Sequence, residues 1–119
     1  MVTLVCALVG VKGNAFPVDI EASQLVGHLK DAIKAKDEDE DIKCSARKLE
    51  LFLAKKGDNK WVESSTDDVK KLKKGEKTAL IEALIHEDNE LQGESGLQKV
   101  LKDMPEPSTD QIHVLVVVP

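Results

Sequence analysis

The sequence predicts an α+β domain in which a mixed sheet packs against several helices. Two segments rich in valine and leucine, 2–9 and 112–118, are apolar on both faces of an extended chain, a pattern typical of buried strands. Between them, segments with apolar residues at helical spacing alternate with turn-forming residues. The chain has 119 residues, of which 41% are apolar. We therefore expect one domain over 1–119 with a largely aliphatic core.

The first part of the chain is expected to form a β-hairpin followed by a helix. Residues 10–14 have turn chemistry, and residues 15–20 return to an extended pattern. Pro17 lacks an N–H group, which confines this second strand to an edge of the sheet. Ser23 has a suitable side chain to be the N-cap of an amphipathic helix over 24–36.

The remaining segments add strands and helices. The strand expected at 48–55 places on one face Leu49, Leu51 and Leu53, and on the other Glu50, Phe52 and Ala54. A short partner strand at 60–63 and helices at 67–74, 78–89 (with Thr78 as N-cap) and 97–104 precede the final strand. The order β-β-α-β-β, helices, β resembles the ubiquitin-like β-grasp, in which the last strand lies between the first and the third.

Composition and charge disfavour several classes of protein. The net charge is −5 and lysines are interspersed with acidic residues, so we expect no nucleic-acid partner. The apolar segment 1–11 lacks a basic start and is too short to span a bilayer, which favours a strand over a cleaved signal and leaves at most transient membrane contact. The chain has two cysteines, Cys6 and Cys44, which are far apart in the sequence and do not form a disulfide framework. We expect two free thiols, with one bridge between them as the alternative.

No catalytic or metal-binding constellation is evident, so we expect neither an enzyme nor a cofactor. The three histidines, His28, His86 and His113, fall on different predicted elements without zinc-site spacing. The acidic segment 37–41 matches the first ligands of a calcium loop. It is followed by Ile42 where that loop needs glycine and by Lys48 where it needs glutamate. We expect this segment to be a solvated loop.

Several ordered segments carry a family resemblance. The sequence Leu51-Phe52-Leu53-Ala54-Lys55 is accompanied by the segments 1–11, 15–20 and 29–34 and by the ending His113-Val114-Leu115-Val116-Val117-Val118-Pro119. Together they resemble the N-terminal region of Crinkler effectors, which oomycete plant pathogens secrete. That family is defined by an LFLAK motif near residue 50 and an HVLVxxP motif that closes the N-terminal module. An Asp-Trp-Leu motif often found in the family is absent here.

The resemblance implies a ubiquitin-like module for secretion and delivery into plant cells. Residues 1–65 would be the LFLAK part, and 66–119 a helical insertion with the final strand; the variable C-terminal domain, which carries toxic or nuclear activities, would be absent. The implied translocation residues are Leu51, Phe52, Leu53, Ala54 and Lys55; the module-end residues are His113, Val114, Leu115, Val116 and Pro119. The partner would be a protein, either a transport or a host factor. The alternative is a ubiquitin-like interaction domain that engages host ubiquitin machinery.

The alternation within the LFLAK segment separates packing from recognition. Leu51 and Leu53 share a face with Leu49 and are expected to pack under the first helix. Phe52, Ala54 and Lys55 are then the candidates for contact with a partner. We therefore expect any recognition signal to lie on Phe52, Lys55 and their surface neighbours.

Overall fold

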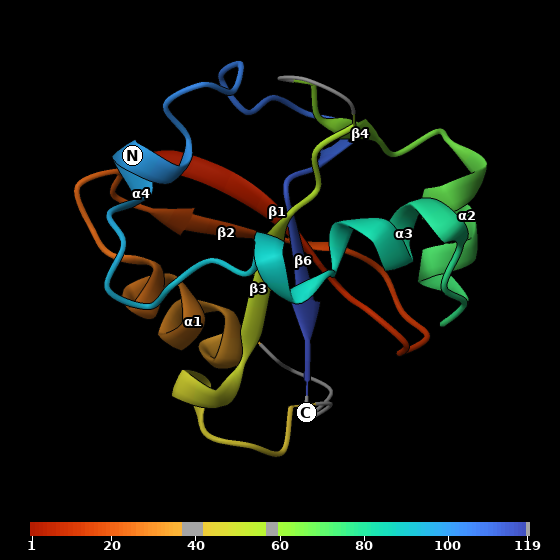
Figure 1. Cartoon of the computed structure of the whole chain (residues 1–119), viewed down its shortest axis with the longest axis horizontal. Coiled ribbons are helices and arrows are strands. Elements are labelled where there is room, and N and C mark those ends of the chain that lie inside the picture. Colours follow the sequence, from red (N-terminus) through yellow and green to blue (C-terminus); the bar gives the residue numbers. More distant parts are fainter. Residues whose placement is uncertain (37–41, 57–59, 119) are drawn as a thin grey trace.

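A mixed four-stranded sheet forms the centre of the computed structural model, which describes residues 1–36, 42–56 and 60–118 (Figure 1). The strands are β1 Val2–Leu8, β2 Phe16–Ile20, β3 Glu50–Leu53, β4 Val62–Glu63, β5 Gln111–Ile112 and β6 Val114–Val117. The α-helices are α1 Val26–Ala35, α2 Asp67–Lys73, α3 Ala79–Leu84 and α4 Leu97–Val100, and the 3-10 turns are η1 Ala46–Lys48 and η2 Glu87–Asn89. The α+β class predicted from the sequence is confirmed.

The strand order of the main sheet is β2-β1-β6-β3. β1 pairs with β2 in antiparallel and with β6 in parallel orientation, and β6 pairs with β3 in antiparallel orientation. The last strand therefore lies between the first and the third, as expected. Pro17 is on the edge strand β2, opposite Val5, where its missing N–H group costs no hydrogen bond within the sheet.

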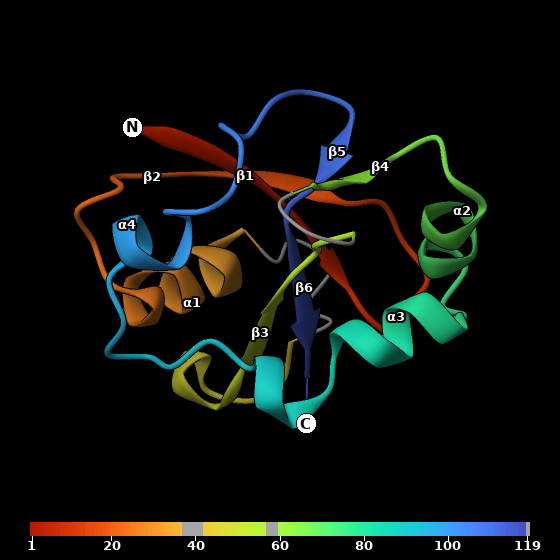
Figure 2. The same cartoon turned by 45° about the horizontal axis from the view of Figure 1, so that its top comes forward.

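Both faces of the sheet are covered, as the two-sided apolar strands predict. Figure 2 shows α1 and α4 on one side and α2 and α3 on the other. The first hydrophobic cluster contains Leu4, Cys6, Val18, Ile20, Val26, Leu29, Ile33, Ile42, Leu49, Leu51, Leu97, Val114 and Val116. The second contains Ala7, Val9, Phe52, Ala54, Val62, Val69, Leu72, Ile81, Ile112 and Leu115. Successive residues of each central strand alternate between the two clusters.

Helix α1 begins later than the sequence suggested. Its N-cap is Leu25 rather than Ser23. The N–H group of Leu25 donates to Nδ1 of His28 at 3.1 Å, and N–H groups of the first turn donate to carbonyls of the loop 93–95. A distant loop thus satisfies the helix start, a role that local sequence usually gives to a capping side chain.

The helix predicted over 78–89 is also shorter in the structure. Thr78 is its N-cap, with the hydroxyl accepting from the N–H group of Ile81 at 3.4 Å, but α3 ends at Leu84. The chain then turns so that Leu91 can donate its N–H group to the carbonyl of Leu51 at 2.8 Å, along the free edge of β3. Pairing with this edge requires the helix to stop. The helix expected over 97–104 is likewise reduced to the four residues of α4.

The final predicted strand is interrupted at His113. The residues before it form β5, which pairs with β4, and the residues after it form β6 in the main sheet. Residues 60–63 were expected to pair with 48–55, but this contact is reduced to a single bridge between Lys55 and Trp61. The acidic segment 37–41, expected to be a solvated loop, and residues 57–59 lie outside the described residues.

Candidate functional site

Three residues of the LFLAK motif are buried. Leu51 is fully buried in the cluster beneath α1, as expected. Phe52 and Ala54, which were expected to face outward, are 2% and 0% exposed in the second cluster. That expectation is wrong because β4, β5 and the helices α2 and α3 cover the face toward which both side chains point. Nothing in the local alternation of 48–55 indicates that distant segments return to this face.

The accessible part of the motif is formed by Leu53 and Lys55. Leu53 was expected to lie under α1, but it is only half-buried and belongs to neither cluster. It lines a cavity of about 130 Å³ together with Lys55, Leu84, Asn89 and Leu91. We call this cavity the Leu53 pocket. Leu84, Asn89 and Leu91 could not be assigned from the sequence because they join the motif only where the chain crosses the edge of β3.

The two motifs lie directly side by side. β3 and β6 are antiparallel neighbours, and the pairs are Leu51 with Val116, Phe52 with Leu115, and Leu53 with Val114 (Figure 1). Val114, Leu115 and Val116 are all buried. Pro119 lies outside the described residues. The structure therefore makes these signatures, more than fifty residues apart in the chain, two paired strands of one core.

His113 connects the second motif to the sheet through both its backbone and its side chain. Its N–H group donates to the carbonyl of Val5 at 2.9 Å, and its carbonyl accepts from the N–H group of Ala54 at 2.9 Å. Its Nδ1 accepts from the N–H group of Val5 at 2.8 Å. Nδ1 therefore carries no proton, so Nε2 carries it and donates to Oε1 of Gln111 at 3.1 Å. At the interruption between β5 and β6, the imidazole Nδ1 thus accepts the hydrogen bond from Val5 that a backbone carbonyl would accept in a regular sheet.

The surroundings of His113 keep the ring neutral. Its side chain is buried, with 1% of the residue exposed, and it meets Trp61 edge-on with ring centroids 4.9 Å apart. Burial lowers the pKa of His113 to about 4, against the opposing effect of a hydrogen bond with the Ser108 backbone. Trp61 is held in turn by its Nε1, which donates to the carbonyl of Pro105 at 2.9 Å. His113 is therefore a structural residue in this arrangement.

The other candidate groups do not converge. Cys6 and Cys44 are free thiols, which settles the alternative left open by the sequence, and burial raises the pKa of the Cys6 thiol. Within residues 1–36, 42–56 and 60–118, histidine, cysteine and acidic side chains form no group of three that could hold a metal ion. In the same part of the chain no helix has the length and apolarity needed to cross a membrane.

These features define a small α+β module. Its two sequence signatures form paired, largely buried strands, and Leu53 and Lys55 remain accessible at their edge. The model of the Crinkler effector protein N-terminal domain matches residues 2–117, and the chain belongs to this family. The resemblance drawn from the LFLAK and HVLVxxP segments is thereby confirmed.

Relatives of known family agree with this assignment. The chain is 56% identical over 119 residues to Crinkler effector protein 8 of Phytophthora infestans and 48% identical over 134 residues to Crinkler effector protein 161 of Phytophthora sojae. Both alignments cover 100% of this chain, but only 19% and 30% of those relatives. The chain thus spans less than a third of their length. No solved structure matches the chain.

Proposed function

We propose that the chain is a non-catalytic module for secretion and host-cell translocation of a Crinkler-type effector, acting through protein–protein contact at the Leu53 pocket. The observation that carries the proposal is the division of the LFLAK motif into buried and accessible residues. Of the five LFLAK residues, a partner can reach only Leu53 and Lys55. They combine an apolar surface with a charge beside Leu84 and Leu91. Small apolar hollows with a charged margin are suited to receiving a partner side chain.

The fold proposed with this function is the ubiquitin-like β-grasp. Its support is the antiparallel β1–β2 hairpin, the helix α1 on one face, and β6 inserted in parallel beside β1. In this arrangement 1–65 supplies the hairpin, α1 and the LFLAK strand, and 66–119 supplies the added helices and the central strand. The greater length of the relatives supports a cargo domain elsewhere in the whole protein. The destination would be the host cell, with the nucleus as a further site for the full-length effector.

The test is a reporter fused to residues 1–119 and assayed for entry into plant cells. Lys55→Glu is expected to reduce entry several-fold, because the exposed ammonium beside the pocket is reversed in charge without removing a buried contact. Thermal unfolding should be nearly unchanged, since exposed substitutions rarely alter stability by more than about 0.5 kcal/mol.

Lys56→Glu is the matched control. Lys56 is also exposed and adjacent in sequence, but it does not line the Leu53 pocket. Entry should persist in this variant. Equal entry of the Lys55 and Lys56 variants would contradict docking at the pocket, and loss of entry in both would point to a general charge requirement.

The alternative function is that of a ubiquitin-like interaction domain that engages host ubiquitin machinery. The observation that supports this alternative is the position of β6 between β1 and β3, which resembles the strand order of the ubiquitin-like β-grasp. Binding of the purified domain to ubiquitin-conjugating and ubiquitin-ligase components, measured by calorimetry, discriminates the two functions. Binding that survives Lys55→Glu while entry is lost would separate interaction from translocation.

A further inference from the structure

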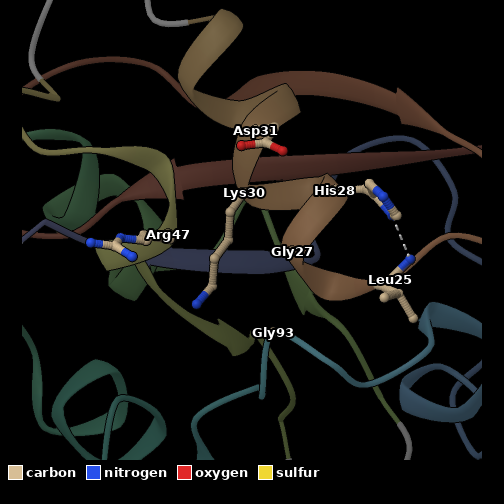
Figure 3. A pocket seen from close by; sticks show the side chains of 7 residues that line it. All are labelled: Leu25, Gly27, His28, Lys30, Asp31, Arg47 and Gly93. Atoms are coloured by element: carbon tan, nitrogen blue, oxygen red, sulfur yellow. Dashed lines mark hydrogen bonds between the residues drawn. The ribbon is translucent and has the colours of Figure 1, made fainter.

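A second cavity, of about 310 Å³, opens beside the start of α1. Its lining comes from α1, the η1 turn and the loop 93–95 and consists of Leu25, Gly27, His28, Lys30, Asp31, Arg47 and Gly93 (Figure 3). None of these residues belongs to the LFLAK or HVLVxxP motif. The cavity is therefore independent of the Leu53 pocket.

Lys30 is the unusual residue in this cavity. Only 7% of it is exposed, yet the described residues give its ammonium no hydrogen bond or ion pair. A lysine one turn later behaves differently: Nζ of Lys34 donates to the carbonyls of Ile42 at 3.2 Å and Cys44 at 2.7 Å. Since none of the described residues has a buried side-chain nitrogen without a partner, the stem of Lys30 is buried while its ammonium remains accessible at the cavity. A cation that no described protein group engages is available to a ligand there.

The charges at the cavity favour an anion. Figure 3 shows the Lys30 side chain extending toward the space between Arg47 and Gly93, whereas the Asp31 carboxylate points away from that space. Nδ1 of His28 is already occupied by the N–H group of Leu25. Lys30 and Arg47 thus bring two permanent cations to the lining of one hollow in a protein whose net charge is −5.

The backbone at the helix start is not available to the ligand. The first-turn N–H groups of Val26 and Gly27 donate to Ser95 and Gly93 at 2.8 and 2.9 Å. A side chain at Gly27 would also stand 3.2 Å from the carbonyl oxygen of Gly93, so this close contact depends on glycine. Recognition of an anion here must therefore come from the side chains of Lys30 and Arg47.

We propose that this cavity binds the phosphate monoester group of a small soluble molecule, held by Lys30 and Arg47. A phosphate monoester offers three acceptor oxygens and up to two negative charges, which match a three-donor ammonium and a guanidinium fork. The volume lies at the lower end of the range for small-molecule pockets, which favours a compact ligand over an extended chain.

The test is a titration of the 119-residue chain, labelled with ¹⁵N, with glucose 6-phosphate, inorganic phosphate and glucose at constant ionic strength. Both phosphates should produce saturable amide shifts around Gly27, Lys30, Arg47 and Gly93, and glucose should produce none. Lys30→Met and Arg47→Gln should each weaken the affinity for glucose 6-phosphate about tenfold, the effect of losing one charge-assisted contact.

Stability distinguishes a binding residue from a structural one. Lys30→Met should leave the melting temperature nearly unchanged or raise it, because methionine keeps an apolar stem in the same place and the ammonium makes no hydrogen bond or ion pair with the described residues that would be lost. Lys34→Met, the matched control on the same helix, should lower it and retain binding, because it removes two hydrogen bonds remote from the cavity lining.

Three results would overturn the proposal. These are the absence of saturable shifts with either phosphate, unchanged affinity in Lys30→Met, or destabilisation by Lys30→Met equal to that by Lys34→Met. A phosphoserine peptide that binds more tightly than glucose 6-phosphate would overturn the assignment to a small molecule and indicate a protein ligand instead.

Discussion

Leu51→Ala is expected to lower the free energy of unfolding by about 2–5 kcal/mol, the usual cost of truncating a fully buried leucine. For a chain of this size the melting temperature should fall by about 10 °C or more. Leu51 is 0% exposed and packs in the same cluster as Leu29 and Ile33 of α1. The remaining side chains can fill such a site only in part, so most of the lost contact is not recovered.

Leu53→Ala is the matched comparison. It removes the same atoms from a half-buried position at the rim of the Leu53 pocket, so its cost should be about 1 kcal/mol or less. Chemical denaturation of the parent protein and of the Leu51→Ala and Leu53→Ala variants measures the loss in free energy of unfolding for each substitution. Equal destabilisation by the two substitutions would contradict the division of the motif into core and rim.

This difference bears on how loss of translocation should be interpreted. A Leu51 variant that fails to enter plant cells is expected to fail through unfolding. A Lys55 variant that fails while its unfolding is unchanged would implicate contact with a partner. Because β3 pairs directly with β6, substitutions in the core of either motif should have the same structural consequence.

The stability of the domain is expected to fall as the pH decreases from about 6.5 toward 4, and His113 should account for about 2–3 kcal/mol of that loss. The pKa of its buried ring is lowered to about 4, whereas an unfolded histidine has a pKa near 6.5. Between these values the unfolded chain binds a proton that the folded chain excludes, so acid favours unfolding. Above the unfolded pKa this contribution to stability is fully present.

The physical cause is the hydrogen bond from the N–H group of Val5. Protonation of His113 would place a proton on Nδ1, the atom that accepts this bond at 2.8 Å. The ring cannot be charged in place without losing the bond and leaving a cation among Trp61 and other buried groups.

His113→Asn is the control for this prediction. Its side-chain oxygen can replace Nδ1 as the acceptor for Val5 but does not titrate in this range. Denaturation profiles collected from pH 4 to 7 should therefore be steeper for the parent protein than for the variant. Carboxylates titrate in both proteins, so the difference between the profiles isolates His113. Parallel profiles, or an NMR titration of the ring near pH 6.5, would contradict the prediction.

The sequence by itself determined the family and much of the architecture. The two-sided apolar pattern of 2–9 and 112–118 correctly predicted buried strands, and Pro17 correctly predicted an edge. The start of α3 at Thr78 also followed from a local signal. These features depend on side-chain periodicity or on the chemistry of single residues, which are encoded locally.

Only the tertiary structure decided which residues of the motifs are accessible. Alternation within 48–55 separates two faces, but it cannot say that β4, β5 and two helices cover Phe52, or that Leu53 is left at a rim. The same limit explains His113, whose bond to Val5 spans 108 positions of the chain. Burial and polar pairing arise from segments that meet only after folding, so no local pattern contains them.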